Sequence, residues 1–319
     1  MYTRREFGAL SAMALGGLAL PRRLAAQIDS TVGGVKIGVQ TYSFRALPRS
    51  VAIVEHDRTA VWPPGEDQSE AIIQAMTRCR IGDCELWSPM LEPVSGVGRD
   101  ASPDARRQAR DELRRWRVET PLSHFEAIRD RFTAAGLTIY GFNYSFDDSF
   151  SDDEIDRGFE IARALGAEII TASSTLSAMK RVVPFAARHQ MVVAVHNHSN
   201  ISDPNEFARP ESFAAAMALS PYVKVNLDIG HFTAANYDPV AYLREHHASI
   251  SNLHLKDRRR DQGANVPWGT GDTPIREVLQ LLQRERWPIR AHIEYEYRGS
   301  GSPVDEVIRG YNYVKQALV

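Results

Sequence analysis

The chain has 319 residues, of which 43% are hydrophobic and 24% are charged, and its formal net charge is −2. This is an ordinary globular composition, long enough for one large domain or two small ones. The slightly acidic balance provides no basic field for nucleic acid and no acidic tail. Cys79 and Cys84 are the only cysteines. They predict two buried free thiols rather than a disulfide, and two cysteines alone cannot form a thiolate zinc site.

The first 27 residues have the pattern of an export signal. A twin-arginine pair in Thr3–Leu10 is followed by an uncharged stretch, Gly8–Leu20, and by small residues before Gln27. The uncharged stretch is too short to span a bilayer stably. We expect a Tat-type signal over 1–27 with cleavage near Ala26, a periplasmic or exported protein, and no stable membrane anchor. The alternative is a basic N-terminus that arose by chance.

From residue 34 onward, strand and helix patterns alternate to the end of the chain. Most of the strand candidates are nearly continuous apolar runs, which is typical of a parallel sheet covered by helices. Strands are expected over 35–42, 83–88, 137–144, 167–174, 191–197, 222–230, 250–257 and 290–296. Amphipathic helices are expected over 67–80, 104–117, 122–136, 151–166, 176–190, 210–219, 238–247, 273–286 and 303–318.

The chain has eight strand and helix units, and no region of different composition marks a second domain. This pattern predicts an α/β fold, namely a single closed (β/α)8 TIM barrel over 28–319. A doubly wound open sheet is the runner-up. That fold usually has a glycine-rich phosphate turn after its first strand, whereas the turn at 40–48 contains no glycine. The long loops at 45–66 and 89–103 are expected over the active face, because strand-to-helix loops build that face of a barrel.

The last four predicted strands each end in a residue type that binds metals: His196, Asp228, His254 and Glu294. Neighbouring strands lie about 4.8 Å apart, so four adjacent ends can converge on one ion at about 2.0–2.2 Å. Two imidazoles and two carboxylates suit Mn²⁺, Fe²⁺, Co²⁺ or Zn²⁺ better than Ca²⁺ or Mg²⁺. Singly, each has another explanation: a hydrogen-bonded core histidine, an arginine-paired Glu294, or a helix-capping Asp228.

Other polar and aromatic residues are expected around this site. His198 and His231 lie next to the ligand candidates, and an unligated histidine suits proton transfer near neutral pH. Aromatic rings can stack on sugar faces while Arg, Lys and Asn hold hydroxyl groups. The substrate-binding candidates are Arg260, Lys256, Tyr42, Phe44, Trp87, Asn143 and Trp268. Ordinary packing at the barrel top is an equally weighted alternative for Trp87, Phe44 and Trp268.

Four segments, VNLDIGH, NLHLKD, the WGTGD loop and HIEYEY, resemble the xylose isomerase-like barrel superfamily. The relevant members are its sugar phosphate isomerase/epimerase proteins, which include ketose 3-epimerases and inosose dehydratases. The resemblance runs from the first strand to the C-terminus and is strongest from residue 191 onward. It implies one divalent metal, often Mn²⁺, bound by Glu, Asp, His and Glu on the last four strands. It also implies barrels that are often dimers or tetramers, so we expect a homo-oligomer as one option.

By this resemblance, Asp228, His254 and Glu294 match the last three metal ligands. His231 and Arg260 match residues that contact substrate. The departure lies at the first ligand, where the family commonly has Glu-Asn-His and this chain has His196 followed by Asn197 and His198. In the family's epimerases, the two glutamates shuttle a proton on the two faces of a ketose. With an imidazole at position 196, proton transfer falls to Glu294, His198 or His231.

These observations predict a metal-dependent isomerase or epimerase that acts on a non-phosphorylated sugar or keto-sugar. A lyase or hydratase of 3-keto-glycosides is an alternative, because a one-base reaction fits β-elimination more easily than two-face epimerisation. A non-catalytic sugar-binding barrel is another alternative. A metal-dependent endonuclease on the same barrel is disfavoured, since the first four strands end in no histidine.

Overall fold

Eight parallel strands form a closed ring in the computed structural model, which describes residues 25–48, 52–55, 58–61, 67–94, 96–98 and 100–319. The predicted signal segment therefore lies outside the described residues, apart from 25–27. The barrel strands are β2 (Val35–Gln40), β5 (Asp83–Trp87), β6 (Thr138–Asn143), β7 (Ile169–Ala172), β8 (Val192–His196), β9 (Val223–Asp228), β10 (Ile250–Leu255) and β11 (Arg290–Ile293). All eight expected strands are present, and pairing of β2 with β5 closes the ring. The predicted single TIM barrel is confirmed.

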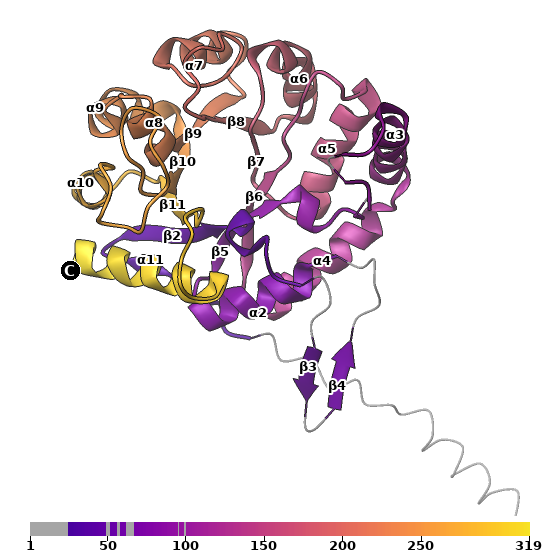
Figure 1. The fold of residues 1–319 in the computed structure, drawn as a ribbon, viewed down its shortest axis with the longest axis horizontal. Coiled ribbons are helices and arrows are strands. Elements are labelled where there is room, and N and C mark those ends of the chain that lie inside the picture. Colours follow the sequence, from indigo (N-terminus) through magenta and orange to yellow (C-terminus); the bar gives the residue numbers. More distant parts are fainter. Residues whose placement is uncertain (1–24, 49–51, 56–57, 62–66, 95, 99) are drawn as a thin grey trace, which may run out of the picture.

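Helices form an outer layer around the strands, as Figure 1 shows. They are α2 (Ser69–Cys79), α3 (Pro103–Glu119), α4 (Leu122–Ala134), α5 (Asp152–Ala164), α6 (Leu176–His189), α7 (Pro210–Met217), α8 (Ile229–Ala234), α9 (Pro239–His246), α10 (Ile275–Glu285) and α11 (Pro303–Leu318). Short 3-10 helices are η1 (Thr41–Phe44), η2 (Ser88–Met90) and η3 (His247–Ser249). None of the helices in the described ranges is long and apolar enough to cross a membrane.

The structure differs from the expected elements in three places. The segment after Asp228, where the strand was expected to run to residue 230, is the short helix α8. The Asp228 carboxylate accepts from the backbone N–H of His231 and caps this helix, as the alternative explanation for Asp228 predicted. The long loop at 45–66 contains a two-stranded antiparallel sheet, β3 (Ala52–Glu55) and β4 (Arg58–Val61). A short strand, β1 (Thr31–Val32), pairs antiparallel with β2.

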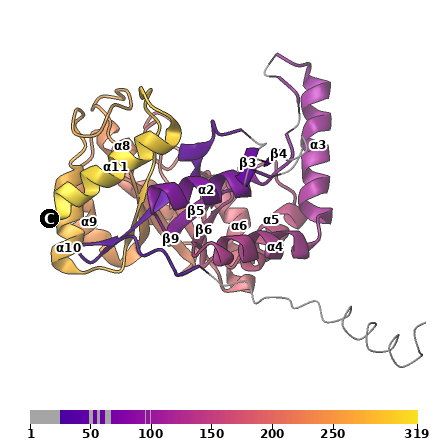
Figure 2. The same cartoon turned by 90° about the horizontal axis from the view of Figure 1, so that it is seen from below.

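Helix α3 is set apart from the rest of the helical layer. Figure 2 shows it upright at one edge of the barrel, and none of its side chains is fully buried. The next strand-to-helix connection ends with a capping box, in which Ser151 and Glu154 satisfy each other's backbone N–H groups at the start of α5. Glu154 also accepts from Arg114 of α3, so this helix start is one anchor of α3.

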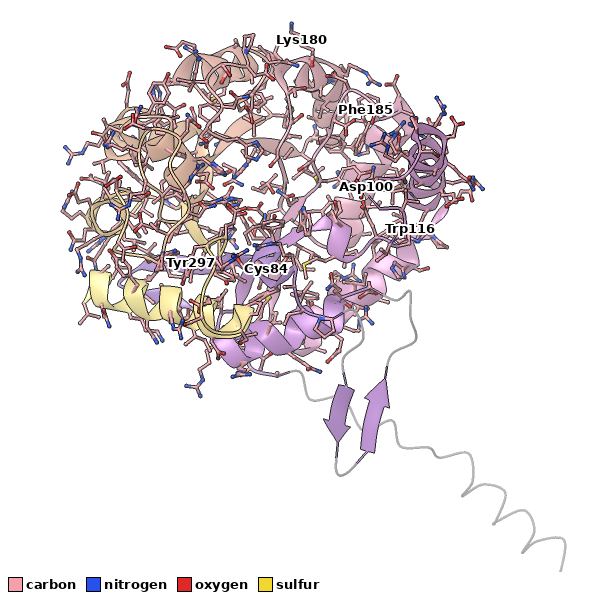
Figure 3. The ribbon with its side chains drawn as sticks, viewed as in Figure 1. Cys84, Asp100, Trp116, Lys180, Phe185 and Tyr297 are labelled. Carbon is pink, nitrogen blue, oxygen red and sulfur yellow. The ribbon has the colours of Figure 1, made fainter. Side chains whose placement is uncertain are left out.

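The main hydrophobic core lies between the strands and the helices, while the barrel interior is largely polar. Cys79 and Cys84 are free and buried, as predicted, and Cys84 is located on β5 in the barrel wall (Figure 3). Burial raises the pKa of the Cys79 thiol to about 12. Inward-facing positions carry buried polar residues instead of the branched aliphatic side chains that usually fill such barrels: Gln40, Asp83, Glu85, Asn143, Thr171, Asn226, Asn252 and His292.

Candidate metal centre

The four predicted ligand side chains lie together at the carboxyl ends of four consecutive strands. His196 and Asp228 end β8 and β9, His254 is the penultimate residue of β10, and Glu294 directly follows β11. One nitrogen or oxygen atom of each lies within 4.8 Å of the corresponding atoms of the other three, and all four residues are buried. The strand register sets this convergence, because His254 pairs with Asp228 across β9 and β10.

His254 Nδ1 and Glu294 Oε2 are buried and make no well-aligned hydrogen bond, although the Lys256 ammonium lies 2.7 Å from Glu294 Oε2 as an ion-pair partner. The His254 and Glu294 atoms lie 3.1 Å apart. Asp228 Oδ2 is 3.9 Å from His254 Nδ1 and 3.3 Å from His196 Nε2. Buried polar atoms are nearly always satisfied. The carboxylates already attract one cation, the Lys256 ammonium, and His254 Nδ1 has no hydrogen-bond partner, so the cluster is suited to a bound cation. Two nitrogen and two carboxylate ligands fit a divalent transition-metal ion.

The ammonium group of Lys256 lies against the same carboxylates. Its Nζ is 3.0 Å from Asp228 Oδ2, 2.7 Å from Glu294 Oε2 and 2.6 Å from Glu296 Oε2. Burial opposes the charged form, but the carboxylates outweigh it and raise the pKa of Lys256. Conversely, Lys256 and then His254 overcome the effect of burial and hold the pKa of Glu294 low. Glu296 is thus an ion-pair partner of Lys256 that does not belong to the four ligand candidates.

The other two histidines of the site have opposite hydrogen-bonding states. The Arg258 guanidinium donates to His231 Nδ1 at 2.6 Å, so that nitrogen is an acceptor and Nε2 carries the proton. Burial and the neighbouring Lys256 charge hold the pKa of His231 well below its ordinary value. His198 Nδ1 instead lies 3.0 Å from the Glu206 carboxylate, to which it donates, and this leaves Nε2 as an acceptor.

His196 contacts its neighbours through both ring nitrogens. Nδ1 lies 3.1 Å from the Ser173 hydroxyl and Nε2 lies 3.3 Å from Asp228 Oδ2. Burial lowers the pKa of His196, which favours the neutral imidazole that metals bind. Its ring centroid is 5.1 Å from that of His198 and 5.9 Å from that of His231. The two histidines outside the ligand set, His198 and His231, therefore both lie beside His196.

Arg258, rather than the predicted Arg260, is the arginine that the structure brings to this cluster. Arg258 is 9% exposed and also donates to Ser199 Oγ and the Gly263 carbonyl. The Arg260 side chain is exposed, and its backbone N–H bonds to Asp272. The sequence DRRR places three adjacent arginines after the strand, and only the turn geometry distinguishes which of them points inward.

Of the predicted aromatic candidates, two are partly exposed and two pack in or against the hydrophobic core. Tyr42 and Trp87 are partly exposed, and their rings meet edge to face with centroids 4.7 Å apart. Phe44 is 0% exposed and lies in the hydrophobic core. Trp268 packs edge to face against Tyr313 of α11, with centroids 5.8 Å apart. Phe44 and Trp268 are thus packing residues, which was the alternative to substrate binding for both.

Asn143 and Glu85 belong to the polar barrel interior. Asn143 Nδ2 donates to the carboxylate of Glu85 at 3.0 Å and to Thr171 Oγ1 at 3.1 Å. Glu85 is 0% exposed, and sequence reasoning missed it. A signal was present, since Asp83 and Glu85 occupy alternate positions of an otherwise apolar strand and must face the barrel interior together.

A cavity of about 200 Å³ opens on the same face of the barrel. Trp87, Pro89, Phe150 and residues of α3 line it, together with Ser145. Ser145 Oγ accepts from the backbone N–H of Ser173, whose hydroxyl meets His196. A larger cavity, about 410 Å³, lies at the opposite end of the barrel beside Gly136–Thr138. The smaller cavity is therefore connected to His196 through Ser145 and Ser173, while none of the four ligand candidates lines it.

The model of the "Xylose isomerase-like TIM barrel" family matches residues 97–317, more than half of the chain. The chain belongs to this family. Membership agrees with the closed eight-stranded barrel and with the sequence resemblance to this family in the last four strands. No curated protein matches the chain significantly.

Several solved structures share the fold at low sequence identity. A sugar phosphate isomerase/epimerase from Parabacteroides distasonis has a TM-score of 0.56 at 14% identity, with 93% of this chain and 99% of that chain covered. The 3-keto-D-glucoside 4-epimerase from E. coli has a TM-score of 0.55 at 12% identity, with 88% and 99% covered. The IOLI protein with a bound zinc atom has a TM-score of 0.59 at 11% identity, with 89% and 98% covered.

Proposed function

We propose that this family member is a divalent-metal-dependent isomerase or epimerase of a non-phosphorylated sugar or keto-sugar. The observation that carries the proposal is the convergence of four buried ligand atoms at the active-face ends of β8 to β11. The zinc atom in the IOLI protein and the sugar epimerase activity in the E. coli protein's name support the same class. Held by His196, Asp228, His254 and Glu294, the ion would supply Lewis-acid polarisation of a sugar oxygen.

The residues around the ligands supply proton transfer. His198, with Nδ1–H bonded to Glu206, presents Nε2 as a general base. His231, with Nδ1 occupied by Arg258, presents Nε2–H as a donor. An acceptor and a donor 5.1 Å apart, measured between ring centroids, are suited to removing a proton from carbon and returning one to oxygen.

The nearby cations favour an uncharged sugar over a phosphorylated one. Lys256 is enclosed by three carboxylates. Arg258 uses its guanidinium for His231, Ser199 and Gly263. Phosphate recognition needs cationic donors that face the ligand, and these two are committed to internal partners.

A keto-sugar lyase or hydratase is the second candidate, and the His196 contacts favour it. The ligand set lacks the glutamate that would serve as the second acid–base group, and His196 instead holds Ser173 and Asp228. A reaction with one base, such as β-elimination from a 3-keto-glycoside, needs an acid–base group on only one face of the substrate.

The metal centre is tested by measuring bound metal in wild-type protein, Asp228→Ala and Glu294→Ala. We expect about one divalent ion per wild-type chain and a loss in both variants. Glu306→Gln is the control, because Glu306 is a buried carboxylate that bonds to Tyr297 and Gly301 away from the centre. Metal occupancy that is unaltered in both alanine variants would rule out this centre.

The reaction is tested with the metal-loaded protein in D₂O, using D-fructose and a 3-keto-glucoside as probes. Deuterium at the C–H next to the carbonyl indicates proton transfer, and release of the aglycone indicates elimination. Exchange without elimination supports the isomerase or epimerase, whereas elimination supports the second candidate. Tight binding of both sugars without either change identifies a binding protein and contradicts the proposal.

A further inference from the structure

A single carboxylate, that of Glu85, connects most of the strands inside the barrel. It accepts hydrogen bonds from donors on β2, β6, β7, β9 and β10, and it has no solvent contact. The donors are Gln40 Nε2 at 2.6 Å, Asn143 Nδ2 at 3.0 Å, Thr171 Oγ1 at 2.7 Å, Asn226 Nδ2 at 3.2 Å, Asn252 Nδ2 at 2.9 Å and His254 Nε2 at 2.8 Å.

The donors around Glu85 define its chemical state. Side-chain amides and a hydroxyl converge on both oxygens, so an ionised carboxylate, which only accepts, satisfies them all. Glutamine at this position would direct an NH₂ group at other donors and leave at least one of them unpaired.

The contact with His254 connects this interior network to the candidate metal centre. Because Glu85 Oε2 accepts at 2.8 Å, His254 Nε2 carries a proton, and the Asn226 amide nitrogen, 3.0 Å from the same Nε2, donates to Glu85 rather than to the ring. Nδ1 is then the nitrogen that is left to bind a metal. It is Nδ1 that lies, unpartnered, 3.1 Å from Glu294 Oε2. The opposite tautomer would place a proton between the ligand atoms and leave Glu85 facing a lone pair.

We propose that Glu85 is a positioning residue, which fixes the ring of His254 and its tautomer so that Nδ1 is presented to a divalent metal. This inference rests on the metal centre of the proposed function. A carboxylate behind a metal-binding histidine raises the basicity of the ring and fixes its orientation. His292 extends the arrangement away from the site, with Nδ1 3.4 Å from Glu85 and Nε2 3.0 Å from Asp83.

The test compares the metal affinities of Glu85→Gln and Asp83→Asn by competition with a chelator, using Zn²⁺ as the probe. Asp83 is a matched control, because it is an equally buried carboxylate on the same strand that bonds to His292 and Arg290 but not to His254. We expect Glu85→Gln to weaken Zn²⁺ binding about 10- to 100-fold and Asp83→Asn to change it by less than about threefold. Equal losses in both variants, or no loss in Glu85→Gln, would overturn the proposal.

A second measurement needs no variant and so remains decisive if Glu85→Gln does not fold. In Zn²⁺-loaded wild-type protein labelled with ¹⁵N-histidine, NMR should show His254 protonated at Nε2 and metal-bound at Nδ1. Metal on Nε2, or a proton on Nδ1, would overturn the proposed role of Glu85 but not the metal centre. Wild-type protein that binds no Zn²⁺ would overturn the metal centre and, with it, this role.

Discussion

At the scale of single residues, the histidines of the candidate centre differ in their partners rather than in their type. His254 is bonded to a carboxylate through Nε2, His231 accepts from an arginine, and His198 donates to Glu206. A histidine's partner decides which nitrogen holds the proton. One ring is therefore suited to bind a metal, one to donate a proton and one to act as the base of the proposed reaction.

His198→Gln tests the base. We expect the rate of deuterium incorporation to fall by about 10²- to 10⁴-fold, the usual contribution of a general base, while metal content stays unchanged. Glu206→Gln should give a smaller decrease, because the imidazole remains but loses the carboxylate that fixes its tautomer. The matched control is His246→Gln, since His246 lies on the outer helix α9. An undiminished exchange rate in His198→Gln would assign the base to another residue.

At the scale of elements, α3 is attached to the barrel by ion pairs and by the partly buried Trp116, whose ring packs against Phe125 of α4. It has no fully buried side chain, and its arginines reach Glu92 and Glu154. Glu154 also completes the capping box of α5. Burial would raise the pKa of Glu154, but the Ser151 backbone N–H and Arg114 lower it. One carboxylate thus joins two helices and stabilises them only while it is ionised.

Glu154→Gln should lower the free energy of unfolding at pH 7 by about 1–3 kcal/mol, the range for losing buried hydrogen bonds to a charged group. Because the folded-state pKa lies below the unfolded value, the contribution is present above about pH 4.5 and is lost as pH falls through the folded-state pKa. The difference between wild type and variant should therefore shrink below about pH 4.5. Urea unfolding across this pH range measures it, with the more exposed Glu160→Gln as control. A difference that does not change with pH would contradict the linkage.

At the scale of the whole molecule, apolar periodicity was enough to predict the barrel but not its interior. All eight strands were expected, because their outward positions are apolar and their spacing leaves room for helices. The strand ends also located His196, Asp228, His254 and Glu294. Glu85, Asn226, Asn252 and His292 were missed as a network, because their partners lie on other strands and only barrel closure brings them together. Arg258 was missed because loop geometry, not residue type, selects it.

At the same scale, the charges around the candidate centre allow a prediction of how metal binding changes the stability of the barrel. In the metal-free protein, Lys256 already compensates the carboxylates, so the barrel should stay folded and should gain stability only by mass action. At a free metal concentration 100 times the dissociation constant, the gain is about 2.7 kcal/mol, or a rise in Tm of about 4 °C for a chain of this size. Calorimetry with Zn²⁺ or Mn²⁺, reversed by chelator, measures it. Asp228→Ala should remain folded and lose the response, whereas a rise that persists in this variant would identify a general ionic effect rather than the centre at β8 to β11.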